Sequence, residues 1–166
     1  MKKLSFVILI LSLFLTEHLF SQVTSTSARG IANLIVPLSI TPVSGDLDFG
    51  EIILTGTPTT ESILPRDGKL FEIIGHPNRF VTITFDNVKL DNSQWVSIYG
   101  GNTGTLIFYP DVETDDGTKV YSGDSKRLVR YGLLGKLNLW VGGSINIAAN
   151  QPQGDYRGLF VISVSY

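Results

Sequence analysis

The sequence of 166 residues has no cysteine, only two histidines and just 17% charged residues. Without cysteine, the chain can form neither a disulfide nor the lipid-modified amino terminus of a bacterial lipoprotein. Lys and Arg number 13 against 15 Asp and Glu, so no basic excess is available to neutralise phosphates, and we expect no nucleic-acid partner. The low charge together with 17 glycines indicates a folded, turn-rich protein.

The amino terminus has the three parts of a secretory signal peptide. Two lysines follow the initiator methionine, an apolar run extends over residues 4–15, and polar residues begin at Ser21. The apolar run is shorter than the about 20 residues that a membrane-spanning helix needs. We therefore predict a signal peptide at 1–21, one domain at 22–166 and no stable membrane span after cleavage. The protein would be exported, in transit through the periplasm, and reach the cell surface, a fimbrium or the extracellular medium.

Apolar and polar residues alternate with a period of two along the remaining chain, and the spacing of an amphipathic helix is not sustained anywhere. Strands are predicted between turn signals rich in Gly, Pro and Asn. They are residues 34–40, 47–54, 70–74, 81–85, 95–99, 106–109, 137–141, 145–149 and 160–166. A change of apolar parity predicts a bulge or bend at Gly50. The segment 128–134 is ambiguous and could hold a short helix.

Seven to nine short strands at this spacing predict an all-β fold, and an immunoglobulin-like β-sandwich fits better than a helical or α/β domain. A small barrel stays open as an alternative. Pro37 lies in the first predicted strand and has no backbone N–H, so that strand is predicted at a sheet edge. Because no disulfide can form, stability must come from apolar burial and strand pairing.

Residues that could perform catalysis or bind a metal are few. After cleavage His76 is the sole histidine, and its Gly-His-Pro-Asn turn favours an exposed structural role over that of a base. Asp46 and Asp48 fit a solvated strand face better than the paired carboxylates of a glycosidase. The acidic stretch 111–117 lacks the sixth-position Gly and twelfth-position Glu of an EF-hand loop, which leaves a weak irregular cation site as the minor alternative. We expect no enzyme activity, no cofactor and no metal site.

Three large aromatic side chains, Trp95, Tyr99 and Trp140, could together form a platform for a sugar. In a sandwich such residues are more often part of the core or half-buried. The alternative function is therefore a self-complete, monomeric secreted module that binds a glycan or a host or surface protein. It would use this aromatic region or the loops around 100–127.

Two motifs lie near the two ends of the mature chain. The first is Leu-Asp-Phe-Gly at 47–50; the second joins Gly-Gly-Ser-Ile-Asn-Ile at 142–147 to a Gln-Pro-Gln-Gly-Asp-Tyr-Arg-Gly turn and a last alternating strand at 151–166. Together they resemble a family of exported bacterial domains of unknown function that is similar to the Mat/Ecp common-pilus major subunit. The match leaves residues 55–135 loosely constrained, and the first strand is less rich in alanine than that family's. The resemblance implies an immunoglobulin-like sandwich in a fimbrial or surface-structure subunit.

Chaperone-usher pilins have an incomplete sandwich, and a strand from a chaperone and later from the next subunit fills its groove. The candidate donor or first strand presents Leu34, Val36, Leu38 and Ile40. The candidate groove-bordering terminal strand presents Phe160, Ile162, Val164 and Tyr166. The expected partners are other copies of this chain or related subunits, and a periplasmic chaperone is a further candidate. Since the first strand could also complete its own sandwich, both arrangements stay open.

Overall fold

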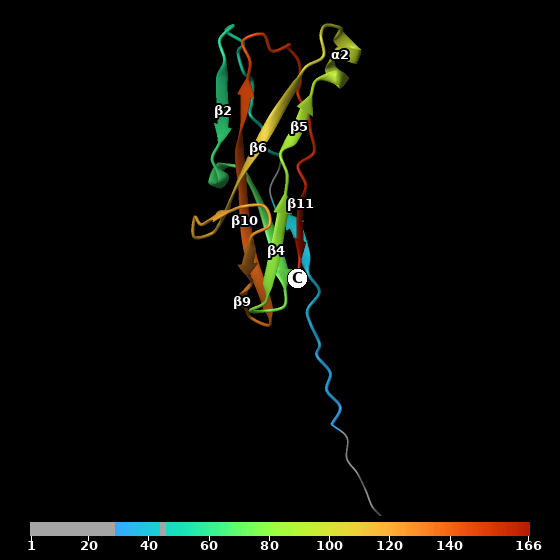
Figure 1. The fold of residues 1–166 in the computed structure, drawn as a ribbon, viewed down its shortest axis with the longest axis vertical. Helices are drawn as coiled ribbons and strands as arrows, with labels where there is room; N and C mark the ends of the chain where they lie inside the picture. The colour runs from blue at the N-terminus through green and yellow to red at the C-terminus, as the bar shows by residue number, and fades with distance from the viewer. Residues whose placement is uncertain (1–28, 44–45) are drawn as a thin grey trace, which may run out of the picture. The chain divides into compact units, whose positions relative to one another are not determined.

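The computed structural model describes residues 29–43 and 46–166, so the predicted signal peptide lies outside the described residues. The chain divides into two units, of which Leu34–Tyr166 contains every described strand. Eleven strands form two antiparallel sheets in this unit (Figure 1). The all-β sandwich prediction is confirmed, with more strands than the seven to nine expected.

The larger sheet has eight strands, and its main path runs β1-β3-β10-β6-β5. Its strands are β1 (Ser39–Pro42), β2 (Thr59–Ile63), β3 (Lys69–Gly75), β5 (Val88–Asp91), β6 (Thr105–Thr114), β7 (Lys119–Val120), β9 (Val129–Tyr131) and β10 (Leu134–Ile147). The smaller sheet has the order β11-β4-β8, with β4 (Phe80–Phe85), β8 (Ser125–Arg127) and β11 (Ile162–Ser165). Two short helices complete the described elements, the 3-10 helix η1 (Pro65–Asp67) and α2 (Ser93–Tyr99).

Strand β10 is the spine of the larger sheet. It is 14 residues long, pairs with β9 and then β6 along one side, and pairs with β3 and then β2 along the other. The prediction of two strands separated at Gly142 and Gly143 is therefore wrong. A Cβ atom on Gly142 would overlap the carbonyl oxygen of Ile63, and one on Gly143 would overlap that of Tyr109. The two glycines do not break the strand but let its neighbours approach closely.

The larger cluster of buried apolar residues lies between the two sheets. Ile73 and Leu139 of the larger sheet meet Val81 and Ile83 of the smaller sheet there, and all four are fully buried. A second cluster, on β6 and the far half of β10, is formed by Leu106, Phe108, Ile145 and Ile147. The side chains packed against this second cluster come from β5 of the same sheet and from irregular segments, not from the smaller sheet, so the sandwich has one layered half and one loop-covered half.

The Leu-Asp-Phe-Gly motif belongs to the loop-covered half. Leu47 and Phe49 pack against the second cluster, and the Phe49 ring meets that of Phe108 edge-on at 6.0 Å between centroids. Gly50 has a φ of 69°, and its N–H donates to Asp48 Oδ1 at 2.8 Å. Gly50 adopts a left-handed backbone conformation, but the predicted strand over 47–54 does not form. The Asp48 side chain replaces a strand partner with a local turn, which competes with ladder formation.

Two further assignments from sequence are corrected. Residues 95–99 lie in helix α2 instead of a strand, with the Trp95 and Tyr99 rings one turn apart at 5.2 Å between centroids. Such i, i+4 ring contacts stabilise a helix and are indistinguishable from strand alternation in so short a stretch. The ambiguous segment 128–134 holds no helix, because Gly132 adopts a φ of 63° and turns β9 back onto β10.

Two polar side chains, those of Asn92 and Tyr156, hold the loops in the loop-covered half in place. We call this pair the loop latch. Asn92 is fully buried; its Nδ2 donates to the carbonyl oxygens of Asn102 at 3.2 Å and Gln153 at 2.9 Å, and its Oδ1 accepts from Gly104 N at 2.7 Å. The Tyr156 hydroxyl donates to the Pro152 carbonyl oxygen at 2.6 Å. The Gln-Pro-Gln-Gly-Asp-Tyr turn at 151–156 therefore has a structural role, since its hydrogen bonds hold the neighbouring loops together.

Candidate interaction site at the sheet edges

The two sheets present neighbouring edges where the chain's first described strand meets its last. β1 pairs with β3 at one end of the larger sheet, with Ser39 opposite Ile74 and Pro42 opposite Phe71. β11 pairs with β4 at one end of the smaller sheet. We call the region formed by residues 34–42, β3 and β11 the seam. The predicted edge position of the first strand is confirmed, although the strand begins only after Pro37.

The candidate first-strand residues follow the predicted alternation. Val36, Leu38 and Ile40 are half-buried while the residues between them are exposed. Leu38 and Ile40 pack against the larger apolar cluster. Leu34 differs, because it is 89% exposed. Among the four candidates Ile40 alone lies in β1, since Pro37 cannot donate to a ladder and pairing starts two residues after it.

The candidate terminal-strand residues reach the same cluster from the opposite sheet. Ile162 is buried, and Phe160 and Val164 pack partly buried against the cluster. Phe160 lies at the junction of the two clusters, with its ring centroid 6.4 Å from that of Phe71 and 5.9 Å from that of Phe108. The structure therefore brings together the two groups of residues that the sequence singled out.

Tyr166 ties the seam together. Its hydroxyl donates to the Val36 carbonyl oxygen at 2.8 Å and accepts from the His76 backbone N–H at 2.6 Å. The His76 ring also takes part, because its Nδ1 accepts from Val36 N at 3.4 Å. The Arg79 guanidinium lies over the Tyr166 ring, 5.0 Å from the centroid. One tyrosine thus joins the first described strand region, the β3–β4 turn and the carboxyl-terminal strand.

Sequence reasoning identified Tyr166 only as an apolar border residue and His76 only as an exposed turn residue. His76 is half-buried in the seam. The available signal was a tyrosine closing an alternating apolar strand, because a tyrosine hydroxyl that is partly buried needs a hydrogen-bond partner. Its partners lie 90 and 130 residues earlier in the chain, and no local pattern encodes that pairing.

The carboxylates considered as an acid and base pair have separate structural contacts. Asp46 forms an ion pair with Lys69 at 3.6 Å. Asp48 accepts a hydrogen bond from the backbone of Gly50. Both side chains are exposed and lie outside any described strand, so they are solvated but form no strand face.

The acidic stretch 111–117 is occupied by contacts within the protein. The hydroxyl of Thr114, and then the side chain and backbone of Thr118, hydrogen-bond to the Asp116 carboxylate and lower its pKa to about 2. Asp115 accepts from Trp140 Nε1 at 2.9 Å and lies 3.8 Å from the Arg66 guanidinium. Within residues 29–43 and 46–166, no three His, Cys, Asp or Glu side chains converge as metal ligands would.

The aromatic residues considered for a sugar platform lie on different elements. Trp95 stacks on Tyr99 in α2, whereas Trp140 on β10 packs under Arg66 with 5.1 Å between guanidinium and ring centroid. Within the part of the chain that the structure describes, Trp95 and Tyr99 contact each other and neither ring contacts that of Trp140. Binding of a glycan stays a prediction.

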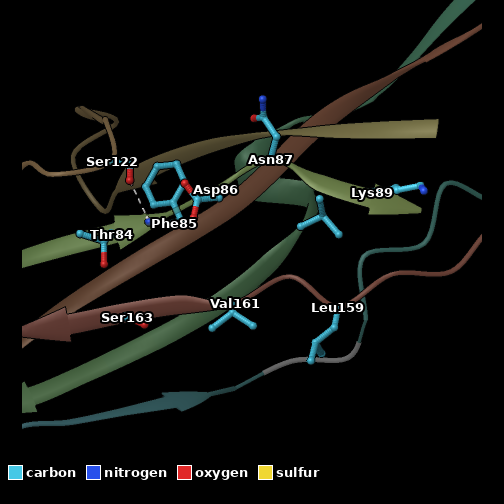
Figure 2. A pocket seen from close by; sticks show the side chains of 10 residues that line it. Thr84, Phe85, Asp86, Asn87, Lys89, Ser122, Leu159, Val161 and Ser163 are labelled. Atoms are coloured by element: carbon cyan, nitrogen blue, oxygen red, sulfur yellow. Dashed lines mark hydrogen bonds between the residues drawn. The ribbon is translucent and has the colours of Figure 1, made fainter. Parts of the chain in front are cut away.

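An open depression lies beside β11 and is lined by the end of β4, the β4–β5 turn, the start of β5 and the chain leading into β11 (Figure 2). It has a volume of about 580 Å³, and Leu159 and Val161 form an exposed apolar part of its wall. At its rim, Phe85 N donates to Ser122 Oγ at 2.9 Å. Its remaining polar lining includes Asp86, Asn87 and Lys89. Because nothing in this mixed lining selects a ligand, the depression is a weaker candidate than the seam.

Comparison with known proteins adds a family to this geometry. A family model described as a domain of unknown function (DUF4402) matches residues 38–166, from within the first strand region to Tyr166. No curated protein matches the sequence. Among the described residues, no helix has the length and apolar character needed to cross a membrane.

Proposed function

The chain belongs to the DUF4402 family of domains of unknown function, and from that premise we propose that it is a structural subunit of a fimbria or a related cell-surface assembly. In this proposal the chain is exported, loses residues 1–21, and joins neighbouring copies or related subunits by strand complementation. The resemblance of its motifs to the Mat/Ecp common-pilus major subunit is part of the proposal. The exchanged element is the first strand region, residues 34–42.

The single observation that carries the proposal is the position of this region in the seam. It pairs with the edge of one sheet, packs Leu38 and Ile40 on the shared apolar cluster, and contacts the terminal residue of the other sheet. A strand that fills the gap between two sheet edges is what strand complementation requires. The same slot can accept the same segment from a second copy.

Exchange of an identical segment conserves the contacts that hold it. In a domain-swapped arrangement residues 34–42 of one copy make with a neighbour the contacts they otherwise make at home, so little energy separates the two states. The strand itself is only four residues long, and within the described residues it pairs with β3 alone. A short edge strand of this kind separates more easily than a central one such as β10.

The test uses the absence of cysteine. Ser39 on β1 lies opposite Ile74 on β3, and neither side chain is part of the buried core. The double variant Ser39→Cys/Ile74→Cys, expressed from the full sequence and purified from the periplasm, is oxidised and run on non-reducing denaturing gels. If the strand is donated in the same register, the introduced thiols link different chains and a covalent ladder appears.

In the matched control, the thiol at position 39 is moved to position 103. Thr103→Cys/Ile74→Cys carries the same number of thiols, but Thr103 lies in the exposed loop after α2, so it should stay mostly uncrosslinked. The unmodified protein is analysed in parallel by light scattering on a sizing column and by unheated and heated gels. Heat-sensitive multimers are expected. An oxidised double variant that migrates only as an internally crosslinked monomer, beside a monomeric unmodified protein, would contradict the proposal.

A further inference from the structure

One end of the Leu34–Tyr166 unit carries more basic than acidic side chains. Residues 73–85 and 125–140 contain no Asp or Glu and include five basic residues, Arg79, Lys126, Arg127, Arg130 and Lys136. Lys126 and Lys136 are ion-paired with Asp124 and Glu72, which precede the two segments, so among the described residues Arg127 and Arg130 carry the uncompensated charge. Backbone hydrogen bonds join the two segments, because Leu128 N donates to Arg79 O at 2.8 Å and Leu128 O accepts from Asn78 N at 2.9 Å. We call this surface the basic end.

Large apolar side chains are exposed among these basic residues. Each of the following is at least 61% exposed: Phe80, Val129, Tyr131 and Leu133. They come from the start of β4, from β9 and from the β9–β10 turn, which surround the same end of the unit (Figure 1). Apolar and aromatic side chains within a charged rim are typical of protein interaction surfaces.

A complementary surface is formed by residues 46–61, which we call the acidic segment. It contains Asp46, Asp48, Glu51 and Glu61 and no Lys or Arg. Asp46 and Asp48 have the contacts given above, whereas Glu51 and Glu61 take part in no ion pair among the residues that the structure describes. Ile53, exposed on the same segment, adds an apolar group.

The basic end and Glu61 of the acidic segment lie at opposite ends of β10. Lys136, near the start of β10, is opposite Val129 of β9, and Ile145, near its end, is opposite Glu61 of β2. At about 3.3 Å per residue, the nine-residue step from Lys136 to Ile145 measures roughly 30 Å. The two surfaces therefore cannot neutralise each other within one molecule.

We propose that the basic end of one copy docks on the acidic segment of the next copy. The inference rests on the proposed function, which supplies the second copy as the partner, and the opposite charges supply the orientation. Because the two surfaces differ and lie at opposite ends, the contact is head to tail and can repeat, whereas a twofold contact would pair one surface with itself.

The test exchanges the two charges. Arg127→Glu/Arg130→Glu reverses the basic end, and Glu51→Lys/Glu61→Lys reverses the acidic segment. Self-association is measured by light scattering and sedimentation at about 0.02 M and about 0.5 M salt. Exposed charges attract each other over only about 10 Å at 0.1 M salt, and over a shorter distance at higher salt. Each reversal should weaken low-salt association at least tenfold, and an equimolar mixture of the two variants should restore it.

The control Lys89→Glu/Lys119→Glu changes the net charge by the same amount at exposed positions of β5 and β7 and should associate like the unmodified protein. Circular dichroism and urea unfolding check each fold. If a reversal variant fails to fold, Arg130→Gln and Glu61→Gln replace it, each with an expected loss of about threefold. Association that ignores the reversals and salt, or a mixture that fails to recover, would overturn the docking proposal.

The two proposals fail in different experiments. Strand exchange is detected as covalent ladders of the Ser39→Cys/Ile74→Cys variant on denaturing gels. Complexes held only by end-to-end charge contacts dissociate on such gels and give no ladder. Docking is read from salt-dependent association under native conditions. A ladder without charge dependence leaves strand exchange standing alone, and salt-dependent association without a ladder leaves docking without strand exchange.

Discussion

The seam and the loop latch both fasten segments distant in sequence with a polar side chain, but they differ in burial. Asn92 in the loop latch is fully buried and satisfies three backbone groups. Tyr166 in the seam is 43% exposed and contacts two backbone groups. Water can replace the partners of an exposed hydroxyl but not those of a buried amide, so opening the seam costs less than opening the latch.

This difference separates a firmly held half of the molecule from a half whose edge opens more easily. The loop-covered half has no sheet opposite β6 and the end of β10, so its loops must be held in place by specific bonds. The layered half has apolar packing between two sheets, and residues 34–42 add to it from the edge. Elements that move in assembly are expected at the less stable edge.

The largest effect is expected from breaking the loop latch. Asn92→Ala would leave the Asn102 and Gln153 carbonyls and the Gly104 N–H without their partner in a buried place, and it should lower the free energy of unfolding by about 3 kcal/mol. Urea unfolding measures the change. Asn87→Ala, at an exposed asparagine in the β4–β5 turn, is the matched control and should change stability by less than about 0.5 kcal/mol. Equal effects of the two variants would refute the assigned role of Asn92.

A smaller and more local effect is expected at the seam. Tyr166→Phe removes the hydroxyl that contacts Val36 and His76 while keeping the ring, and should cost about 1 kcal/mol. Hydrogen exchange should accelerate at the β1 amides more than at the central amides of β10. Tyr121→Phe, at a 67% exposed tyrosine outside the seam, serves as the control. Uniform acceleration over both strands would mean that the seam does not open separately.

The smallest effect concerns the turn between β6 and β7. The pKa of Asp116 is lowered to about 2, from an ordinary value of 3.8, because the hydroxyl of Thr114 and then Thr118 stabilise its charged form. A lowered folded-state pKa contributes stability above pH 3.8 that is lost as pH falls through about 2. Asp116→Asn should therefore reduce the loss of stability over this window, measured against Asp86→Asn. An unchanged pH profile would contradict the assignment.

Sequence patterns predicted what depends on local alternation. The all-β class and the edge position of the first strand follow from side-chain period and proline chemistry, and both are confirmed. The strand predicted over residues 95–99 was wrong because aromatic residues one helical turn apart and strand alternation give the same pattern over five residues. The predicted strand break at Gly142 and Gly143 was wrong because these glycines make room for the neighbouring strands, whose positions a single sequence does not reveal.

The candidate site was predictable only in its apolar part. The alternating residues of the first and last strands were identified and do meet on one cluster. The polar contacts of Tyr166 with His76 and Val36 were not, since they join residues 90 and 130 positions apart. Apolar faces are encoded by nearby residues, whereas the partner of a hydroxyl is decided by topology.

The length of β10 has a mechanical consequence. This one strand runs from the basic end to the neighbourhood of the acidic segment, so tension applied between the two ends would pass along it. Ladder hydrogen bonds lie across the strands, and a pull along β10 shears its seven pairs with β6 together instead of opening them one by one. At β1 the same pull meets four pairs with β3, so under force the edge strand would slip while the spine holds.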